Sequence, residues 1–299
     1  MDYEHFLRSN MLVPIHPLGQ GAFGCVYLAY HHDYGLVAVK IFLKDKFDEK
    51  EYDASFELYR TRKENIFLTK LLKYNDSGKN HYIIMEYANM GTLNIIAQQP
   101  QIPLPSYVLR ALMNQILMGM KEFHDSGLVH RDIKCDNILL HSPPGSGLVH
   151  AKISDFGFAK YEDLINEQTY TAGTLPYMAP EMFKKPLIVT QKVDIYALGI
   201  TFYKLITHKY PVNESSLKEQ GIKINQMKSI DKPAEITDNL LWNLLSQMLE
   251  FDPDKRIIAA DVIFHPYFQS SEANADISEE QKKLASLANV AYKNHFAGN

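Results

Sequence analysis

The chain has 299 residues, 46% of them hydrophobic, and a formal net charge of −4 at pH 7. This length allows two ordinary domains or one large two-lobed unit, and the apolar content is enough for a true core. The slightly acidic balance and the lack of polybasic stretches argue against a nucleic-acid binder whose affinity depends on neutralising phosphates.

The cysteines and the apolar runs indicate the compartment. Cys25 and Cys135 are the two cysteines of the chain. They lie far apart without metal-ligand spacing, so neither a disulfide scaffold nor a zinc site is supported. Charged residues interrupt the N-terminal segment, which excludes a signal-peptide core, and no run reaches the roughly 18 apolar residues of a membrane helix. We therefore expect an intracellular, cytoplasmic protein without membrane insertion.

Extended segments dominate the first part of the chain. Runs of β-branched and aromatic residues at Val26 to Tyr30, Leu36 to Phe42 and Tyr82 to Tyr87 are bounded by Gly, Asp and Asn. They predict the strands of a small, mostly antiparallel sheet. Between Phe47 and Lys63, charged residues alternate with scattered apolar ones, and this pattern predicts the one amphipathic helix of this part.

The second part of the chain is predicted to be largely helical. Apolar residues recur at helical spacing from Pro105 to His124, from Lys192 to Thr207 and from Asn239 to Glu250. Pro143 to Gly147 predicts an exposed loop between short strands. The polar, Ala-rich residues after Phe268 predict a short helix or a frayed end.

A glycine-rich segment precedes a lysine at the end of an apolar strand. Gly19, Gly21 and Gly24 form GxGxxG, in which backbone amides can approach phosphate oxygens because no Cβ intervenes. The residues that follow predict a strand rather than a helix, so the glycines lie in a hairpin and a dinucleotide fold is disfavoured. Lys40 ends VAVK, where an ammonium needs an anionic partner. The alternative to a phosphate-binding role is that Lys40 is an ordinary surface lysine at the end of a strand.

Three short motifs between His130 and Glu181 supply polar groups for phosphoryl transfer. HRDIKCDN contains Asp132, a carboxylate able to orient a hydroxyl nucleophile, and Asn137, an oxygen ligand for Mg²⁺. DFG contributes a second magnesium ligand, Asp155, and APE ends on Glu181. Each motif alone is weak, but the set seldom arises by chance.

With these motifs the chain resembles the eukaryotic protein kinase family, serine/threonine type, from about Leu12 to Phe268. The resemblance implies an α+β, bilobal protein-kinase-like fold, with a small antiparallel-sheet N-lobe holding one helix and a larger helical C-lobe. The kinase domain is expected over residues 11–268, divided into an N-lobe at 11–88 and a C-lobe at 89–268, with a C-terminal tail at 269–299.

The resemblance also implies ATP and Mg²⁺ as cofactors. The expected nucleotide-binding residues are Leu18, Gly19, Gly21, Gly24, Val26, Ala38, Lys40, Glu57, Met85, Glu86, Ala88 and Leu139. Lys40 would bind the α and β phosphates, and the apolar side chains would enclose the adenine, with Glu86 to Ala88 as the hinge. For the apolar positions the alternative is ordinary core packing.

The family pairs its strand lysine with a glutamate of the N-lobe helix, and three candidates remain here. Glu57 has apolar neighbours, so one side of it can face the core. Glu51 comes early, while Glu64 precedes NIF, which resembles the start of the family's fourth strand. We choose Glu57, although charged residues on helices are commonly just solvated.

The family's catalytic roles fall on four residues. By resemblance, Asp132 accepts or orients the hydroxyl proton, Lys134 and Lys40 offset phosphate charge, and Thr174 in GTLPYMAPE contacts the catalytic loop. Asn137 and Asp155 are the expected Mg²⁺ ligands. The HRDIK form and the threonine are typical of kinases that act on protein serine or threonine.

Regulation is expected in the segment between Asp155 and Glu181. Arg131 resembles the arginine that pairs with a phosphorylated residue there, and guanidinium suits bidentate phosphate binding. Thr169 and Thr171 are the expected acceptors, for an upstream kinase or for trans-autophosphorylation. The alternative is that these threonines are never modified.

Two further residues match the family at positions with a structural role. Asp194 resembles the aspartate that braces the catalytic loop, and Arg256 resembles the partner of Glu181.

The predicted activity is transfer of the γ-phosphoryl group of Mg-ATP to protein substrates. The alternatives are a catalytically silent, nucleotide-binding pseudokinase scaffold and a small-molecule phosphotransferase. Asp136, also in the catalytic loop, is a thin indication of basic residues near the acceptor.

Overall fold

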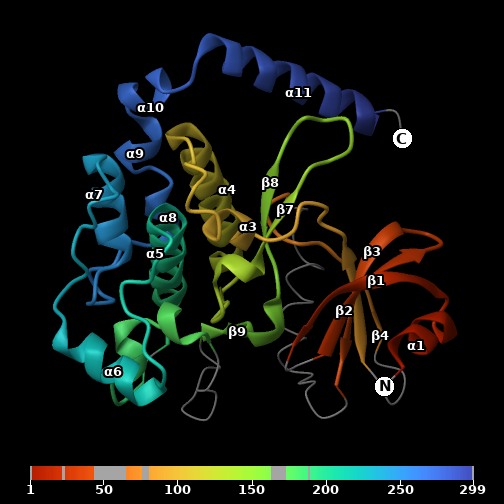
Figure 1. The fold of residues 1–299 in the computed structure, drawn as a ribbon, viewed down its shortest axis with the longest axis horizontal. Helices are drawn as coiled ribbons and strands as arrows, with labels where there is room; N and C mark the ends of the chain where they lie inside the picture. The colour runs from red at the N-terminus through yellow and green to blue at the C-terminus, as the bar shows by residue number, and fades with distance from the viewer. Residues whose placement is uncertain are drawn as a thin grey trace.

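Two lobes of different character make up the molecule. A computed structural model describes residues 2–21, 24–43, 65–75, 81–162, 173–187 and 189–297. A five-stranded sheet forms the N-lobe, and helices form most of the C-lobe (Figure 1). This is the α+β bilobal arrangement that the sequence and the family resemblance predict. The helix expected between Phe47 and Lys63 lies outside the described residues.

The N-lobe sheet has the strand order β1-β2-β3-β5-β4, and every neighbouring pair is antiparallel. Its strands are β1 (Leu12–Gly21), β2 (Gly24–His31), β3 (Gly35–Phe42), β4 (Leu71–Asn75) and β5 (Tyr82–Glu86). The three predicted strands are confirmed as β2, β3 and β5. Glycine residues 21 and 24 pair where β1 meets β2, so the glycine-rich segment lies in a hairpin as predicted.

The fourth strand begins later than the sequence suggested. NIF, residues 65–67, is a turn, and β4 starts at Leu71, so the expected start was wrong. The side chain of Asn65 accepts a hydrogen bond from the Phe67 N–H at 2.7 Å, and its carbonyl accepts from the Leu68 N–H at 3.3 Å. These local bonds occupy amides that a strand would need for its ladder.

A short helix that the sequence did not predict, α1 (Tyr3–Ser9), covers one face of the sheet. Asp2 caps it by accepting from the His5 N–H at 3.0 Å. Leu7 is buried in a small core cluster with residues of the sheet: Leu12, Ala29, Val37, Val39, Ile41, Tyr82 and Ile84. Because side chains alternate along a strand, the residues between these positions point to the opposite face.

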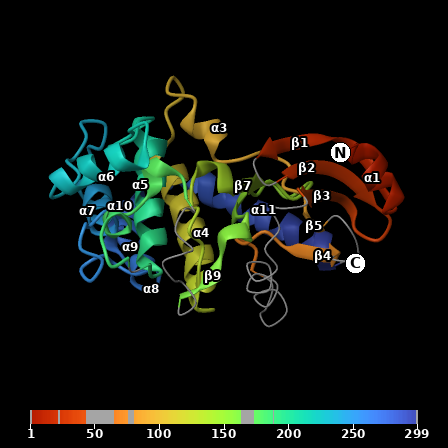
Figure 2. The same ribbon diagram turned by 90° about the horizontal axis from the view of Figure 1, so that it is seen from below.

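The C-lobe is built around two long helices, α4 (Ser106–His124) and α5 (Lys192–Thr207). Figure 2 shows the two lobes from below, with α4 and α5 on the helical side. The other helices are α3 (Asn94–Ala97), α6 (Leu217–Gln226), α7 (Asn239–Met248), α8 (Ala259–Val262), α9 (Pro266–Gln269) and α10 (Ser271–Ala275). The three predicted helices are confirmed as α4, α5 and α7. Their apolar faces share one large core.

Two short antiparallel strand pairs flank the HRD and DFG motifs. The first pairs β7 (Ile138–His141) with β8 (His150–Ile153), and the second pairs β6 (Leu128–Val129) with β9 (Lys160–Tyr161). The loop predicted at Pro143 to Gly147 connects β7 and β8, as expected. It is not wholly exposed, because Ser146 is buried.

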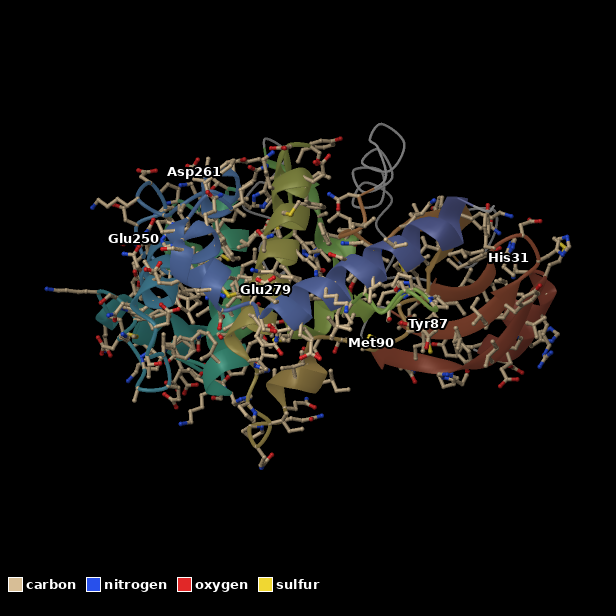
Figure 3. The ribbon with its side chains drawn as sticks, turned by 90° about the horizontal axis from the view of Figure 1, so that it is seen from above. His31, Tyr87, Met90, Glu250, Asp261 and Glu279 are labelled. Carbon is tan, nitrogen blue, oxygen red and sulfur yellow. The ribbon has the colours of Figure 1, made fainter. Side chains whose placement is uncertain are left out.

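The C-terminal tail forms a long helix, α11 (Glu279–Ala297), rather than a short or frayed one. It crosses the C-lobe and runs toward the N-lobe above the connection that carries Tyr87 and Met90 (Figure 3). A Cβ added at Gly147 would lie 3.6 Å from the Cβ of Ala288, so the helix meets the β7–β8 loop. Within the described ranges, no helix is long and apolar enough to cross a membrane.

Candidate active site

The carboxylate of Asp132 is the centre of a dense polar network. Its Oδ1 accepts from the Thr174 hydroxyl at 3.0 Å, and its Oδ2 accepts from Lys134 Nζ at 2.7 Å and Asn137 Nδ2 at 2.9 Å. Lys134 Nζ also donates to Thr174 Oγ1 at 3.0 Å. The four residues come from the catalytic loop and from the segment before APE. The structure therefore brings together the predicted catalytic residues of the C-lobe.

A buried aspartate of α5 holds the backbone of this loop. Asp194 accepts from the N–H groups of His130 at 2.8 Å and Arg131 at 2.9 Å, and it pairs with His124 Nε2 at 3.0 Å. Burial opposes its charge, but the hydrogen bond and charge of His124 outweigh burial, so the pKa of Asp194 is lowered. Arg131 has φ of 69°. Asp194 thus stabilises a backbone turn that a non-glycine residue rarely adopts.

Lys40 reaches from the N-lobe to Asp155 of the C-lobe, with Nζ 2.5 Å from Oδ1. Burial disfavours the charged carboxylate, but the Lys40 ammonium and its hydrogen bond outweigh burial, so the pKa of Asp155 is lowered. A Cβ at Gly157 would lie 3.3 Å from Asp155 Oδ1 and 3.6 Å from Lys40 Nζ. Glycine at this position leaves space around the pair.

The DFG phenylalanine anchors Asp155 to the C-lobe core. The ring of Phe156 stacks on Phe123 of α4 with 5.4 Å between centroids, and it meets the His130 ring edge-on at 5.6 Å. His130 Nε2 pairs with the carbonyl oxygen of Ser154 at 3.0 Å. These contacts connect the HRD and DFG motifs, which hold the two carboxylates predicted to be functional, Asp132 and Asp155.

Apolar residues expected to enclose the adenine share a face of the N-lobe sheet with Lys40. Val26 lies opposite Lys40 in the register, and Ala38 lies opposite Met85. Since Ala38 and Lys40 are two positions apart, all four side chains lie on the face away from α1. Val26 and Met85 are half-buried, as is Leu139 on β7 of the C-lobe. These are partly open apolar surfaces rather than closed core.

The other expected nucleotide contacts lie at the ends of this face. Leu18 sits at an irregularity of β1 and is exposed. Glu86 ends β5, and its N–H donates to the Lys70 carbonyl oxygen at 2.9 Å. Ala88 follows and is buried.

Packing requires glycine at one of the three hairpin positions but not at the other two. A Cβ at Gly24 would lie 1.9 Å from the Ile41 carbonyl oxygen, so packing against β3 demands glycine there. At Gly19 and Gly21 a Cβ would meet nothing within 4 Å and no unusual φ occurs. Neither packing nor backbone strain requires these two glycines. Open space over their backbone fits the approach of phosphate oxygens.

The oxygen donors fit a magnesium ion that is shared with phosphates. Because Asn137 Nδ2 donates to Asp132, its amide oxygen is the atom left for a cation. Asp155 supplies a carboxylate with one oxygen bound to Lys40. Among the described residues, no three His, Cys, Asp or Glu side chains gather as a metal site. Two protein oxygens completed by phosphates match the usual coordination of Mg²⁺.

The structure does not test several of the predicted residues. Glu57 and its competitors Glu51 and Glu64 lie outside the described residues, as do Thr169 and Thr171. The glutamate partner of Lys40 and the phosphorylation sites therefore stay predictions. Arg131 is placed, and its Nε donates to the Phe158 carbonyl oxygen at 2.6 Å.

The APE glutamate forms a buried ion pair. Glu181 accepts from Arg256 through both carboxylate oxygens, at 2.6 and 2.8 Å, and the Arg256 side chain is fully buried. Arg256 also donates to the carbonyl oxygens of Glu250 and Lys192, while Lys192 Nζ donates back to the Arg256 carbonyl. This pairing, suggested by the resemblance, ties the end of the segment after DFG to α5.

A charged cluster that was not predicted from the sequence lies beside Glu86, at the end of β5. Lys152 of β8 pairs with Glu86 at 2.9 Å, although its side chain is only 7% exposed. His141 and His150 face each other across β7 and β8 beside this pair. Burial lowers the pKa of both histidines, and Lys152 adds to the effect while Glu86 opposes it. The sign of this cluster in the sequence is the alternation of polar and apolar residues in HAKI, residues 150–153.

We expect this cluster to make stability depend on pH. The pKa of each histidine is lower in the fold than its ordinary 6.5, so the unfolded chain binds protons first as pH falls. The stabilisation is present above about pH 6.5 and is lost below it.

Urea unfolding at about pH 7 and about pH 5 measures this effect. The free energy of unfolding should fall less between the two pH values for His141→Gln/His150→Gln than for the wild type. His32→Gln, at an exposed histidine, should match the wild type, and an equal loss in all three proteins contradicts the prediction.

Comparison with known proteins agrees with this site. The family described as protein kinase domain matches residues 12–268. A probable serine/threonine-protein kinase of Dictyostelium discoideum is 31% identical over 270 residues, covering 88% of this chain and 57% of that protein. Aurora kinase C of Mus musculus is 30% identical, covering 88% of the chain and 93% of that protein.

A human relative, serine/threonine-protein kinase ULK3, is 30% identical over 259 residues, covering 84% of the chain and 53% of that protein. The chain thus spans little more than half the length of two of these three relatives. The match covers both lobes and every motif of the polar network. This chain therefore belongs to the eukaryotic protein kinase family.

Proposed function

We propose that the chain transfers the γ-phosphoryl group of Mg-ATP to serine or threonine hydroxyls of proteins. The observation that carries this proposal is the network in which Thr174, Lys134 and Asn137 all donate to the Asp132 carboxylate. Three donors hold the carboxylate at a defined position, which is what an in-line transfer requires of its base. The names of the serine/threonine kinases among its relatives point the same way.

Each residue of the network has a separate task. Asp132 orients the substrate hydroxyl and accepts its proton, while Lys134 offsets the charge that develops on the transferred group. Thr174 fixes both side chains through its hydroxyl. Since Asp132 is 6% exposed, water screens its interactions less than at an open surface.

Lys40, Asn137 and Asp155 form the nucleotide side of the site. Lys40 would bind the α and β phosphates above the hairpin of Gly19 and Gly21, and Asn137 and Asp155 would hold Mg²⁺. When bound, Mg²⁺ would offset the negative charge of the phosphates. Asp155 also serves as the anion that the Lys40 ammonium requires.

The same proposal covers the limits of the domain and its partners. We assign the kinase domain to residues 11–268, divided after residue 88, with residues 269–299 as a tail. Proteins are the substrates, and Thr169 and Thr171 are the sites for an upstream kinase or for trans-autophosphorylation. The cytoplasmic setting expected from the sequence stays a prediction.

Incubation with labelled ATP, Mg²⁺ and a mixed protein substrate tests the proposal. We expect the wild type to label serine and threonine, identified by phosphoamino-acid analysis, well above Asp132→Asn. Equal labelling by the two proteins would support a nucleotide-binding scaffold without catalysis. Labelling confined to tyrosine or to small molecules would reject the assigned substrate class.

A further inference from the structure

A chain of polar side chains lies beside the catalytic loop. Asn94, at the start of α3, donates from Nδ2 to Asp136 Oδ1 at 2.7 Å, and its Oδ1 accepts from Lys204 Nζ at 3.5 Å. Lys204, near the end of α5, also donates to the Tyr210 hydroxyl at 2.7 Å. That hydroxyl lies 3.1 Å from the hydroxyl of Tyr177. We call these five residues the Lys204 cluster.

The cluster joins the two segments that position the acceptor hydroxyl. Asp136 belongs to η1 (Cys135–Asn137), directly after Lys134 of the catalytic loop, and Tyr177 ends η5 (Leu175–Tyr177), directly after Thr174. Lys134 and Thr174 are hydrogen-bonded to each other. The Lys204 cluster therefore borders the residues to which we assign the acceptor hydroxyl.

Lys204 has only neutral partners in the described part of the chain. Its ammonium lies over the Tyr210 ring at 4.5 Å and donates to one phenol and one amide. No carboxylate oxygen of a described residue lies within 4.0 Å of Lys204 Nζ, the distance that defines an ion pair. Two of its three N–H donors are used, and the side chain is half-buried. Partly desolvated cations are normally paired with an anion.

Asp136 does not supply that anion. Asn94 stands between the two charges, with its amide nitrogen on Asp136 and its amide oxygen on Lys204. Asp136 is exposed, whereas Lys204 is half-buried. Water therefore weakens the field of the carboxylate more than that of the ammonium. The indication of basic substrates that Asp136 offered is outweighed at this position.

We propose that Lys204 is a specificity-determining residue that binds an anionic group on the substrate, next to the acceptor in sequence. The anion is the carboxylate of an Asp or Glu, or the phosphate of a residue that is already phosphorylated. This inference rests on the proposed function, because the cluster borders the acceptor site. It gives the substrates their chemical class, an acidic peptide.

A peptide series tests the inference. Each serine peptide carries Gln, Glu or phosphoserine at one of the two positions on either side of the acceptor. At one position the wild type should prefer Glu over Gln by about 3- to 10-fold in kcat/KM, mainly through KM, as a charge-assisted hydrogen bond provides. The phosphoserine peptide separates the two sources of the anion, since a larger preference for it indicates phosphorylated substrates.

Variants assign the preference to one side chain. Lys204→Met should bring the Glu-to-Gln ratio toward one, Lys204→Arg should keep it above one, and Lys204→Glu should reverse it. Lys209→Met is the matched control, because Lys209 is 76% exposed and pairs with Glu235 instead. It should keep the wild-type ratio, whereas a similar loss in both methionine variants would overturn the assignment.

Binding of the labelled peptides, measured by fluorescence anisotropy, separates two kinds of failure. A wild type that phosphorylates all peptides equally, at every position, overturns the inference and leaves the kinase activity intact. A wild type that phosphorylates none of them contradicts the proposed function. In that case tighter binding of the Glu or phosphoserine peptide, lost in Lys204→Met, still supports the anion site, and equal binding rejects it.

Discussion

Lys40→Met is expected to lower phosphoryl transfer by about 10²- to 10³-fold, the usual effect of removing one hydrogen-bond donor that stabilises a transition state. Lys40 shares a sheet face with the apolar residues that are expected to enclose the adenine, and its ammonium lies 2.5 Å from Asp155. The variant loses a cation for the phosphates. It also removes the Lys40 ammonium that favours the charged carboxylate of Asp155. Burial, the largest effect on the pKa of Asp155, then raises that pKa without this opposing partner.

Initial rates with labelled ATP and the affinity for ATP measure this effect. Lys73→Met is the matched control, because it makes the same change at an exposed position of β4 in the same sheet. It should retain wild-type rates. Thermal unfolding of both variants shows whether a loss of rate follows from a loss of fold. A folded Lys40→Met protein with wild-type rates would remove Lys40 from the nucleotide site.

The C-lobe half of the site was predictable because its residues are close in sequence. Asp132, Lys134 and Asn137 belong to the single motif HRDIKCDN, and Asp155 follows the short β7–β8 hairpin. Local geometry then determines most of their distances. Thr174 lies farther along the chain, and its position at Asp132 was predicted from the family resemblance rather than from any periodic pattern.

The partners of charged residues across elements were not predictable in the same way. Alternation in VAVK assigns Lys40 to one face of a strand, but it does not say whether Asp155 or a helical glutamate lies opposite. Lys152 presented the same difficulty, because nothing local in HAKI identifies Glu86 as its partner. Such pairs depend on how separate segments pack, and a pattern within one segment carries no information on that.

The helix α1 escaped prediction for a different reason. Seven residues are too few to show a helical period, and isolated helices of that length are not stable in water. Its formation depends on Leu7, which is buried against the sheet. The stabilising energy is therefore tertiary, and no pattern within so short a segment reveals it.

Glu181→Gln is expected to lower the free energy of unfolding by about 3 to 5 kcal/mol, the usual cost of breaking a buried ion pair from one side. Both carboxylate oxygens accept from the guanidinium of Arg256, whose side chain is 0% exposed. Gln keeps the size of Glu but turns an N–H group toward the guanidinium. The Arg256 charge is then buried with one acceptor fewer and no anion.

Urea unfolding at neutral pH measures this loss, and Glu279→Gln is the control. It makes the same change at a side chain that is 89% exposed and pairs with Lys282, so its unfolding midpoint should equal that of the wild type. The double variant Glu181→Leu/Arg256→Met removes both charges and should recover part of the loss, because the penalty comes from the unpaired charge. It also loses the Arg256 bonds to Glu250 and Lys192, so recovery should be incomplete. A Glu181→Gln protein as stable as the wild type would show that the buried pair adds no net stability to the segment it anchors.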